Sequence, residues 1–265
     1  MPDYTGFNEI AVTTDGLVAT VEIRRPPNNF FDAALIAEIG QAFERIDADP
    51  AIRTIVLAAE GRHFCAGADF SKRMDTGTVQ ESNRSGGGRH LYKEAIRLFR
   101  TQKPVVGAIH GAAVGGGLGL AAVADFRIAT PSSRFAANFV KLGIHQGFGL
   151  SVTLPRLVGE QRAAELLLTG RRIGGEEARA IGLVDRLVPE AELREAAFAF
   201  AGEIAVNAPL AIVSIRATLR RGLYEQASEA MIRERTEQAR LRRTDDAEEG
   251  LRAVADRRDG RFTGR

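Results

Sequence analysis

The segment from His110 to Leu120 carries the clearest chemical signal in the sequence. It reads HGAAVGGGLGL, so an apolar strand leads into three consecutive glycines that open an apolar helix. The first N–H groups of a helix have no partner within the helix, and the helix dipole adds partial positive charge there. Glycine lets a ligand approach this backbone closely. The segment therefore suits an oxygen that carries or gains negative charge, either a phosphate or an oxyanion.

Two phosphate-binding motifs fail on the spacing of this segment. The pattern GxxxxGK[ST] needs a Lys-Ser or Lys-Thr pair that is absent, and GxGxxG starting at Gly115 needs a glycine where Leu120 stands. A dinucleotide-binding domain is therefore not predicted. Close packing of a strand against a helix explains the glycine run as well as a functional role does.

A second segment, Arg62 to Phe70 (RHFCAGADF), follows a predicted strand and contains a tight turn of small residues. It could offer another backbone N–H group, although by itself it is more typical of a plain loop. No basic partner for Cys65 is apparent, so we expect a small core residue and not a reactive thiol.

Together, and in this order, the two segments resemble the crotonase (enoyl-CoA hydratase/isomerase) superfamily. Four further segments extend the resemblance over nearly the whole chain: KPVVGAIHG at 103–111, ADFRIA at 124–129, LTGR at 168–171 with ARAIGLV at 178–184, and DAEEGLRAVADR at 246–257. The resemblance implies an α/β fold, a crotonase-like spiral of ββα units. It also implies a core with the CoA and acyl site over residues 1–199 and a C-terminal helical region, residues 200–265, that forms a homotrimer or a dimer of trimers.

The family holds the thioester oxygen of an acyl-CoA with two backbone N–H groups, which match Ala68 and Gly116 here. The resemblance also places Ala66, Asp69 and Phe70 in the loop that lodges the adenine and pantetheine of CoA. Arg25 ends the second predicted strand, where it could meet the CoA phosphates or simply lie in solvent. CoA enters as part of the substrate, so neither a separate cofactor nor a metal is expected.

The sequence departs from the family at its proton-transfer positions. The two hydratase glutamates match Gly119 and Phe139, so we expect little ordinary hydratase activity and an apolar acyl pocket. The aspartate of dienoyl isomerases and aroyl-CoA dehalogenases matches Gly147, and the dehalogenase histidine falls at about Tyr92, so neither activity is predicted. His145 and Gln146 belong to a segment near the acyl pocket in family members. His145 is the candidate proton carrier, with a partly buried structural histidine as the alternative.

These residues must be positioned by a small set of elements. Apolar, β-branched runs predict strands at 9–14, 18–24, 54–59, 105–109 and 125–129. Helical spacing predicts helices after Asp32, over 92–100 and from the glycine run to Ala124, and helices dominate from Ala191 onward. The alternation of strand and helix favours a parallel sheet.

Bulk composition narrows the class of protein. A net charge of +2 from 36 basic and 34 acidic residues argues against a nucleic-acid binder. One cysteine excludes an intrachain disulfide and a cysteine-based zinc site. The N-terminus lacks a signal-peptide pattern, and no apolar run reaches the roughly 20 residues of a membrane span, so we expect a cytoplasmic protein. Two functions stay open: an enzyme of fatty-acid or related acyl-CoA metabolism (isomerase, C–C hydrolase or lyase, or atypical hydratase), or a non-catalytic acyl-CoA carrier or sensor.

Overall fold

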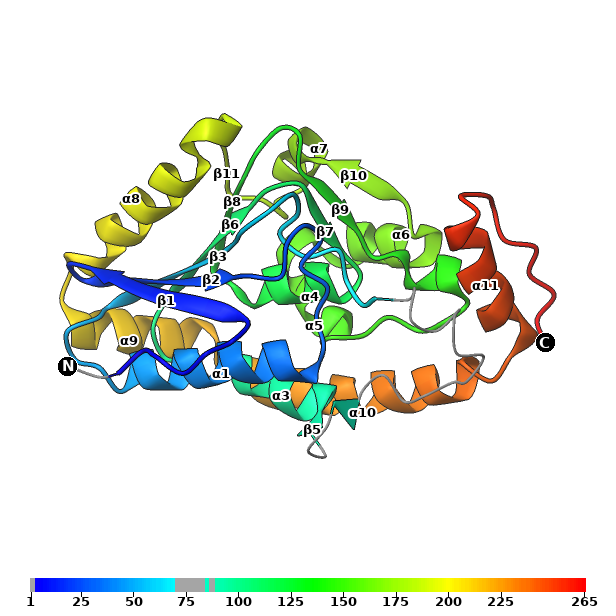
Figure 1. Ribbon diagram of the computed structural model, residues 1–265, viewed down its shortest axis with the longest axis horizontal. Helices are drawn as coiled ribbons and strands as arrows, with labels where there is room; N and C mark the ends of the chain where they lie inside the picture. The colour runs from blue at the N-terminus through cyan, green and yellow to red at the C-terminus, as the bar shows by residue number, and fades with distance from the viewer. Residues whose placement is uncertain (1–2, 70–83, 86–88) are drawn as a thin grey trace.

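The computed structural model describes residues 3–69, 84–85 and 89–265 of the chain (Figure 1). Its largest sheet has six strands in the order β1-β2-β3-β6-β8-β11. Their bounds are Ile10–Asp15 (β1), Val18–Ile23 (β2), Thr54–Ala59 (β3), Val105–Ile109 (β6), Phe126–Ala129 (β8) and Arg186–Leu187 (β11). β1 and β2 pair antiparallel, and the other neighbouring pairs are parallel. The parallel sheet expected from the alternation of strand and helix is thus confirmed.

The central strands are buried along their whole length. Every residue of β3 (TIVLAA) and β6 (VVGAI) is buried. Parallel strands covered on both faces have no solvent side, so their sequences are continuously apolar and do not alternate. The strands predicted at 54–59 and 105–109 are confirmed without a shift, and the other three are confirmed to within one residue at each end.

A second sheet carries the glycine-rich segment. It has three strands in the order β10-β9-β7, with bounds Ala112–Val114 (β7), Arg134–Ala136 (β9) and Arg172–Gly174 (β10). A third sheet pairs Arg84–Ser85 (β4) with Arg89–His90 (β5). An isolated parallel bridge joins Cys65 to Ala113 of β7, so the loop after β3 lies directly beside the second sheet.

Ten α-helices and two short 3₁₀ helices are found among the described residues. Their bounds are Ala33–Asp47 (α1), Leu91–Leu98 (α3), Gly116–Val123 (α4), Asn138–Leu142 (η1), Leu150–Val158 (α5), Glu160–Thr169 (α6), Gly175–Ala180 (α7), Glu190–Glu192 (η2), Leu193–Ala205 (α8), Pro209–Leu219 (α9), Leu223–Leu241 (α10) and Asp245–Ala255 (α11). In Figure 1, α10 runs along the same edge of the molecule as α1 and α3, and α11 lies at the far end near the C-terminus.

The C-terminal helices pack on the core and do not form a separate unit. The division predicted after residue 199 falls inside α8, which packs against β3 and β6. Further on, α10 packs against α3 and α5, and α11 packs against η1. These helices therefore bury apolar residues against the core within a single chain.

A buried ion cluster fastens α9 to the sheet. Asp125, at the start of β8, accepts a hydrogen bond from the Val105 backbone N–H at 2.8 Å. The same carboxylate accepts from Arg216 Nε and Arg220 Nη1, each at 2.8 Å. All three charged side chains are largely buried, so each arginine depends on this one carboxylate for its charge partner.

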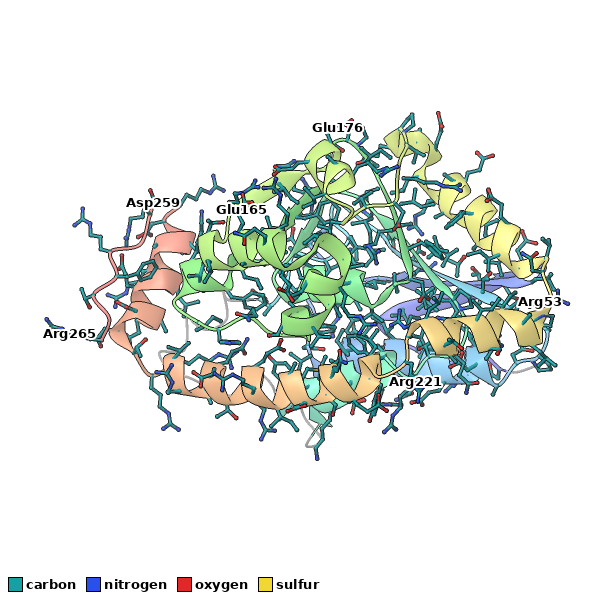
Figure 2. All side chains as sticks on the ribbon, turned by 180° about the vertical axis from the view of Figure 1, so that it is seen from behind. Arg53, Glu165, Glu176, Arg221, Asp259 and Arg265 are labelled. Atoms are coloured by element: carbon teal, nitrogen blue, oxygen red, sulfur yellow. The ribbon has the colours of Figure 1, made fainter. Side chains whose placement is uncertain are left out.

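The outer surface carries many charged side chains and several exposed apolar ones. Figure 2 shows labelled charged side chains such as Glu176, Asp259 and Arg265 on the periphery. On α9, in contrast, Leu210, Ile215 and Leu219 are exposed, Leu210 to 86%. No single helix in the described ranges is long and apolar enough to cross a membrane. Glu190–Ala205 and Pro209–Leu219 reach that length and apolarity only as a pair, and they meet at a 104° bend.

Candidate functional site

Backbone pairing brings the two chemically suggestive segments together. The Cys65 N–H donates to the Ala112 carbonyl at 3.0 Å, and the Val114 N–H donates to the Cys65 carbonyl at 3.1 Å. At Gly117 a Cβ would lie 2.1 Å from the Cys65 oxygen, so only glycine allows this approach. The loop after β3 therefore runs against the glycine run at the start of α4.

The turn before Ala68 is fixed from both sides. Gly67 has φ +93°, a conformation that favours glycine, and its carbonyl accepts from the Phe31 N–H at 3.0 Å. Gly116 is the first residue of α4. Within the described ranges, neither the Ala68 N–H nor the Gly116 N–H has a protein acceptor. Both residues line one cavity, as the pair of carbonyl-binding donors requires.

This cavity has a volume of about 760 Å³ and largely apolar walls. That volume lies within the usual range for small-molecule sites. The apolar lining residues include Phe31, Leu91, Phe139, Leu142, Ile144, Phe148, Leu251 and Val254. The predicted pocket residue Phe139 is thus part of the wall. The last two residues come from α11, so the C-terminal region completes the site within a single chain.

Two of the three positions that carry acids in family members are packed full. A Cβ on Gly119 would lie 2.6 Å from Phe148 Cβ, and a Cβ on Gly147 would lie 2.3 Å from the Tyr92 hydroxyl oxygen. The third position is Phe139 itself, which is buried. Bulky side chains occupy the space where carboxylates would stand. The packing around these three positions therefore agrees with the absence of acidic residues there.

A group of three polar side chains also lines the cavity, and two of them, Gln238 and Arg242, were not singled out from the sequence. Tyr92 comes from α3, and Gln238 and Arg242 come from α10. The Tyr92 hydroxyl donates to Gln238 Oε1 at 3.1 Å, and burial raises the pKa of this phenol. The helical spacing of 238 and 242, one turn apart, was the available signal, but no local pattern shows which face of α10 meets α3.

His63 is a further cavity residue that the sequence did not single out. Its Nδ1 accepts a hydrogen bond from the Ala112 N–H at 3.2 Å, which requires an unprotonated Nδ1. Burial, followed by the charges of Arg62 and Arg134, lowers the pKa of His63. The imidazole is therefore neutral near pH 7 and holds the backbone of β7 beside the loop.

His145 and Gln146 are not among the described residues that line the cavity. The His145 ring places Nδ1 2.9 Å from the Gln146 carbonyl, and the His145 carbonyl accepts from Gln238 Nε2 at 2.9 Å. The Gln146 side chain donates to Ser151 Oγ at 3.1 Å. The backbone of His145 thus contacts the site residue Gln238, whereas its imidazole does not face the cavity. Gly119 likewise lies behind the wall, against Phe148.

Only some of the predicted CoA-binding residues line the cavity. Ala66 and Asp69 line the cavity, and Phe70 lies outside the described residues. The Arg25 guanidinium contacts the carboxylates of Glu9 and Asp32 and is not among the cavity residues. Those two carboxylates raise the pKa of Arg25 against the opposing effect of burial. Arg25 therefore supports the N-cap of α1, because Asp32 accepts from the first N–H groups of that helix.

The sheet, the covering helices and the two N–H groups at an apolar cavity define an α/β protein with a candidate ligand site. Comparison with known proteins agrees. The sequence matches the family described as enoyl-CoA hydratase/isomerase over residues 13–265. It is 32% identical to a probable enoyl-CoA hydratase of Bacillus subtilis, covering 97% of this chain and all of that protein.

Two further comparisons also find similarity to proteins described as hydratases or dehydratases of CoA thioesters. The chain is 33% identical to a carnitinyl-CoA dehydratase of Proteus mirabilis, covering 96% of this chain and 98% of that protein. The crystal structure of a carnitinyl-CoA hydratase from Mycobacterium avium superposes with a TM-score of 0.83 at 30% identity, covering 97% and 99% of the two chains. The chain therefore belongs to the enoyl-CoA hydratase/isomerase family, the crotonase superfamily, and the predicted crotonase-like fold is confirmed.

Proposed function

We propose that this protein binds an acyl-CoA thioester in the 760 Å³ cavity and polarises the thioester carbonyl with the N–H groups of Ala68 and Gly116. The observation that carries the proposal is the meeting of these two donors at one apolar cavity. Preorganised N–H donors stabilise the negative charge of an enolate or tetrahedral oxyanion most strongly where water is excluded. Family membership and relatives described as hydratases and dehydratases support an enzyme of acyl-CoA metabolism.

We further propose that ordinary hydration of 2-enoyl thioesters is weak. Water addition needs one group to take a proton from water and another to deliver one to the α-carbon. The aromatic side chains of Phe148 and Phe139 fill the corresponding positions here. The reaction is then one that proceeds through an enolate or oxyanion with a different proton carrier, such as an isomerisation or a C–C bond cleavage. A non-catalytic carrier or sensor of acyl-CoA is the second candidate, favoured by the same filled positions.

A homotrimer or dimer of trimers is part of the proposal. The exposed apolar side chains of α9, Leu210, Ile215 and Leu219, support it, because exposed apolar groups gathered on one element mark association surfaces. Sedimentation of the purified protein tests the mass of the assembly.

The test of function follows thioester masses in D2O over a panel of acyl- and enoyl-CoAs. Ala68→Pro removes one N–H donor, and the matched variant Ala68→Gly keeps it. We expect conversion or α-proton exchange in the native protein and in Ala68→Gly, and a loss of about 10²–10³-fold in Ala68→Pro. Equal activity of the two variants would refute the role of the Ala68 N–H. Binding without any mass change would favour the carrier.

The same panel tests His145 as the proton carrier. If its imidazole moves the proton, His145→Ala abolishes exchange while leaving thioester affinity intact. Because its ring lies away from the cavity wall, retained activity in His145→Ala would end that hypothesis. Hydration of simple 2-enoyl-CoAs at the rates of a hydratase would overturn the proposed weakness of that reaction.

A further inference from the structure

An arginine at the cavity wall forms no ion pair with any carboxylate in the part of the chain that the structure describes. Arg242 lines the cavity, yet among the described residues no carboxylate lies within ion-pair distance of its guanidinium. Arg240 on the same helix differs, because it donates to Glu237 at 2.8 Å in solvent. Burial lowers the pKa of Arg242, but an arginine side chain stays protonated at neutral pH. A cation held partly out of water without a counter-charge is costly unless an anion joins it.

The Arg242 guanidinium is also held in place, and some of its N–H donors have no partner among the described residues. Its Nη2 donates to Gln238 Oε1 at 2.8 Å. Its Nε is buried and has no hydrogen-bond partner, and Nη1 has no partner among the described residues. Gln238 in turn is fixed by Tyr92 at 3.1 Å and by the His145 carbonyl at 2.9 Å. Gln238 is therefore a positioning residue that orients Arg242, and the free donors of Arg242 suit a planar anion.

A continuous series of contacts connects this group to the carbonyl-binding donors. The Phe31 ring fills the space beside Gly116, where an added Cβ would lie 2.2 Å from it. The rings of Phe31 and Phe148 meet edge to face, with centroids 5.6 Å apart. Gly147, which precedes Phe148 in the chain, packs against the Tyr92 hydroxyl, since an added Cβ there would lie 2.3 Å from the hydroxyl oxygen. The polar group thus stands behind the aromatic wall nearest the thioester carbonyl, which places it at the acyl part of a bound ligand.

Resting on the proposed function, we propose that Arg242 binds a carboxylate carried by the acyl group, so that the preferred ligands are CoA thioesters of dicarboxylic acids. A singly charged carboxylate supplies the missing counter-charge at low desolvation cost and matches the fork of an arginine. The phosphates of CoA fit this place less well, because Tyr92 and Gln238 beside Arg242 are buried and multiply charged groups lose most on leaving water. A cationic acyl group is repelled by Arg242, so the quaternary ammonium of a carnitinyl thioester is disfavoured.

Calorimetric titration with matched thioesters tests this inference. The probes are glutaryl-CoA, pentanoyl-CoA of equal acyl length, and free CoA. We expect glutaryl-CoA to bind the native protein roughly tenfold or more tightly than pentanoyl-CoA. Arg242→Met removes this preference and leaves the affinity for pentanoyl-CoA and free CoA unchanged. Arg240→Met, the matched control on the exposed face of α10, keeps the preference.

Several other results of the titration would overturn the inference. Equal affinity for the two esters in the native protein, or a preference that persists in Arg242→Met, overturns the inference. A parallel loss of affinity for both esters and for free CoA assigns Arg242 to a CoA phosphate and also overturns it. Arg242→Gln, which keeps a neutral donor for Gln238, replaces the methionine variant if that variant does not fold. Failure of every thioester to bind overturns the proposed function itself, and the inference with it.

Discussion

A single methyl group at Gly119 tests whether the missing acid position is truly filled. An added Cβ would lie 2.6 Å from Phe148 Cβ and 2.9 Å from two of its ring atoms, whereas ordinary contacts are 3.4–4 Å. Phe148 cannot retreat easily. Its backbone has φ +61°, and its ring packs edge to face on Phe31. Gly119→Ala must therefore overpack the wall behind the cavity.

The expected change in the free energy of unfolding is estimated by comparing two glycines that both lie in helices. Gly202 in α8 has nothing within 4 Å of its added Cβ, so Gly202→Ala gains about 0.5–1 kcal/mol from helix propensity alone. Gly119→Ala makes the same propensity gain but adds overpacking, which typically costs about 1–3 kcal/mol. The propensity terms cancel in the comparison. We therefore expect Gly119→Ala to be about 1–3 kcal/mol less stable than Gly202→Ala.

Urea unfolding of the two variants, followed by circular dichroism under one buffer, measures this difference. If Gly119→Ala is as stable as Gly202→Ala, Phe148 does not fill the space. The argument that a glutamate has no room at position 119 then fails, and the predicted weakness of hydration loses its structural support.

Three further predictions concern other parts of the molecule. Asp125→Asn leaves two buried arginines without their anion and should lower the free energy of unfolding by about 3 kcal/mol, and a loss below about 1 kcal/mol in urea unfolding would show that the cluster is solvated. Cys65 is fully buried, and burial raises its pKa to about 12, so a thiol reagent at pH 8 should label it only as fast as the protein unfolds. Rapid labelling of the native protein would contradict that burial. His63 has a folded-state pKa below its ordinary 6.5, so the unfolded chain takes up the proton first and stability falls as pH drops below about 6.5. His63→Gln should flatten this dependence, and an unchanged slope would assign it to other groups.

Local sequence signals were sufficient for the elements nearest the site. The continuous apolar runs at 54–59 and 105–109 became buried parallel strands, and the glycine run opened α4 as expected. These patterns are visible in the sequence because each residue meets the structural requirement by itself. A strand buried on both faces needs apolar side chains, and a close backbone approach needs a residue without a Cβ. The pairing of Ala68 with Gly116 was predicted only through a resemblance to known relatives, since no spacing rule places two loops side by side.

Charge pairing was less visible from the sequence. Asp125 pairs with Arg216 and Arg220 of α9. Arg25 was expected either near the CoA phosphates or in solvent, and its guanidinium contacts Glu9 and Asp32. An ion pair depends on which side chains meet across elements, and nothing near either arginine in the sequence encodes that meeting.

The sequence by itself determined the strand and helix pattern, the glycine-opened helix and the absence of glutamates at positions 119 and 139. Only the tertiary structure decided what occupies those positions, which arginines line the cavity and where His145 points. The physical reason is that composition and periodicity are local, whereas a cavity wall is assembled from α3, α10 and α11 at long range. Burial of Arg242 beside Gln238, without a carboxylate, exists only once those helices pack.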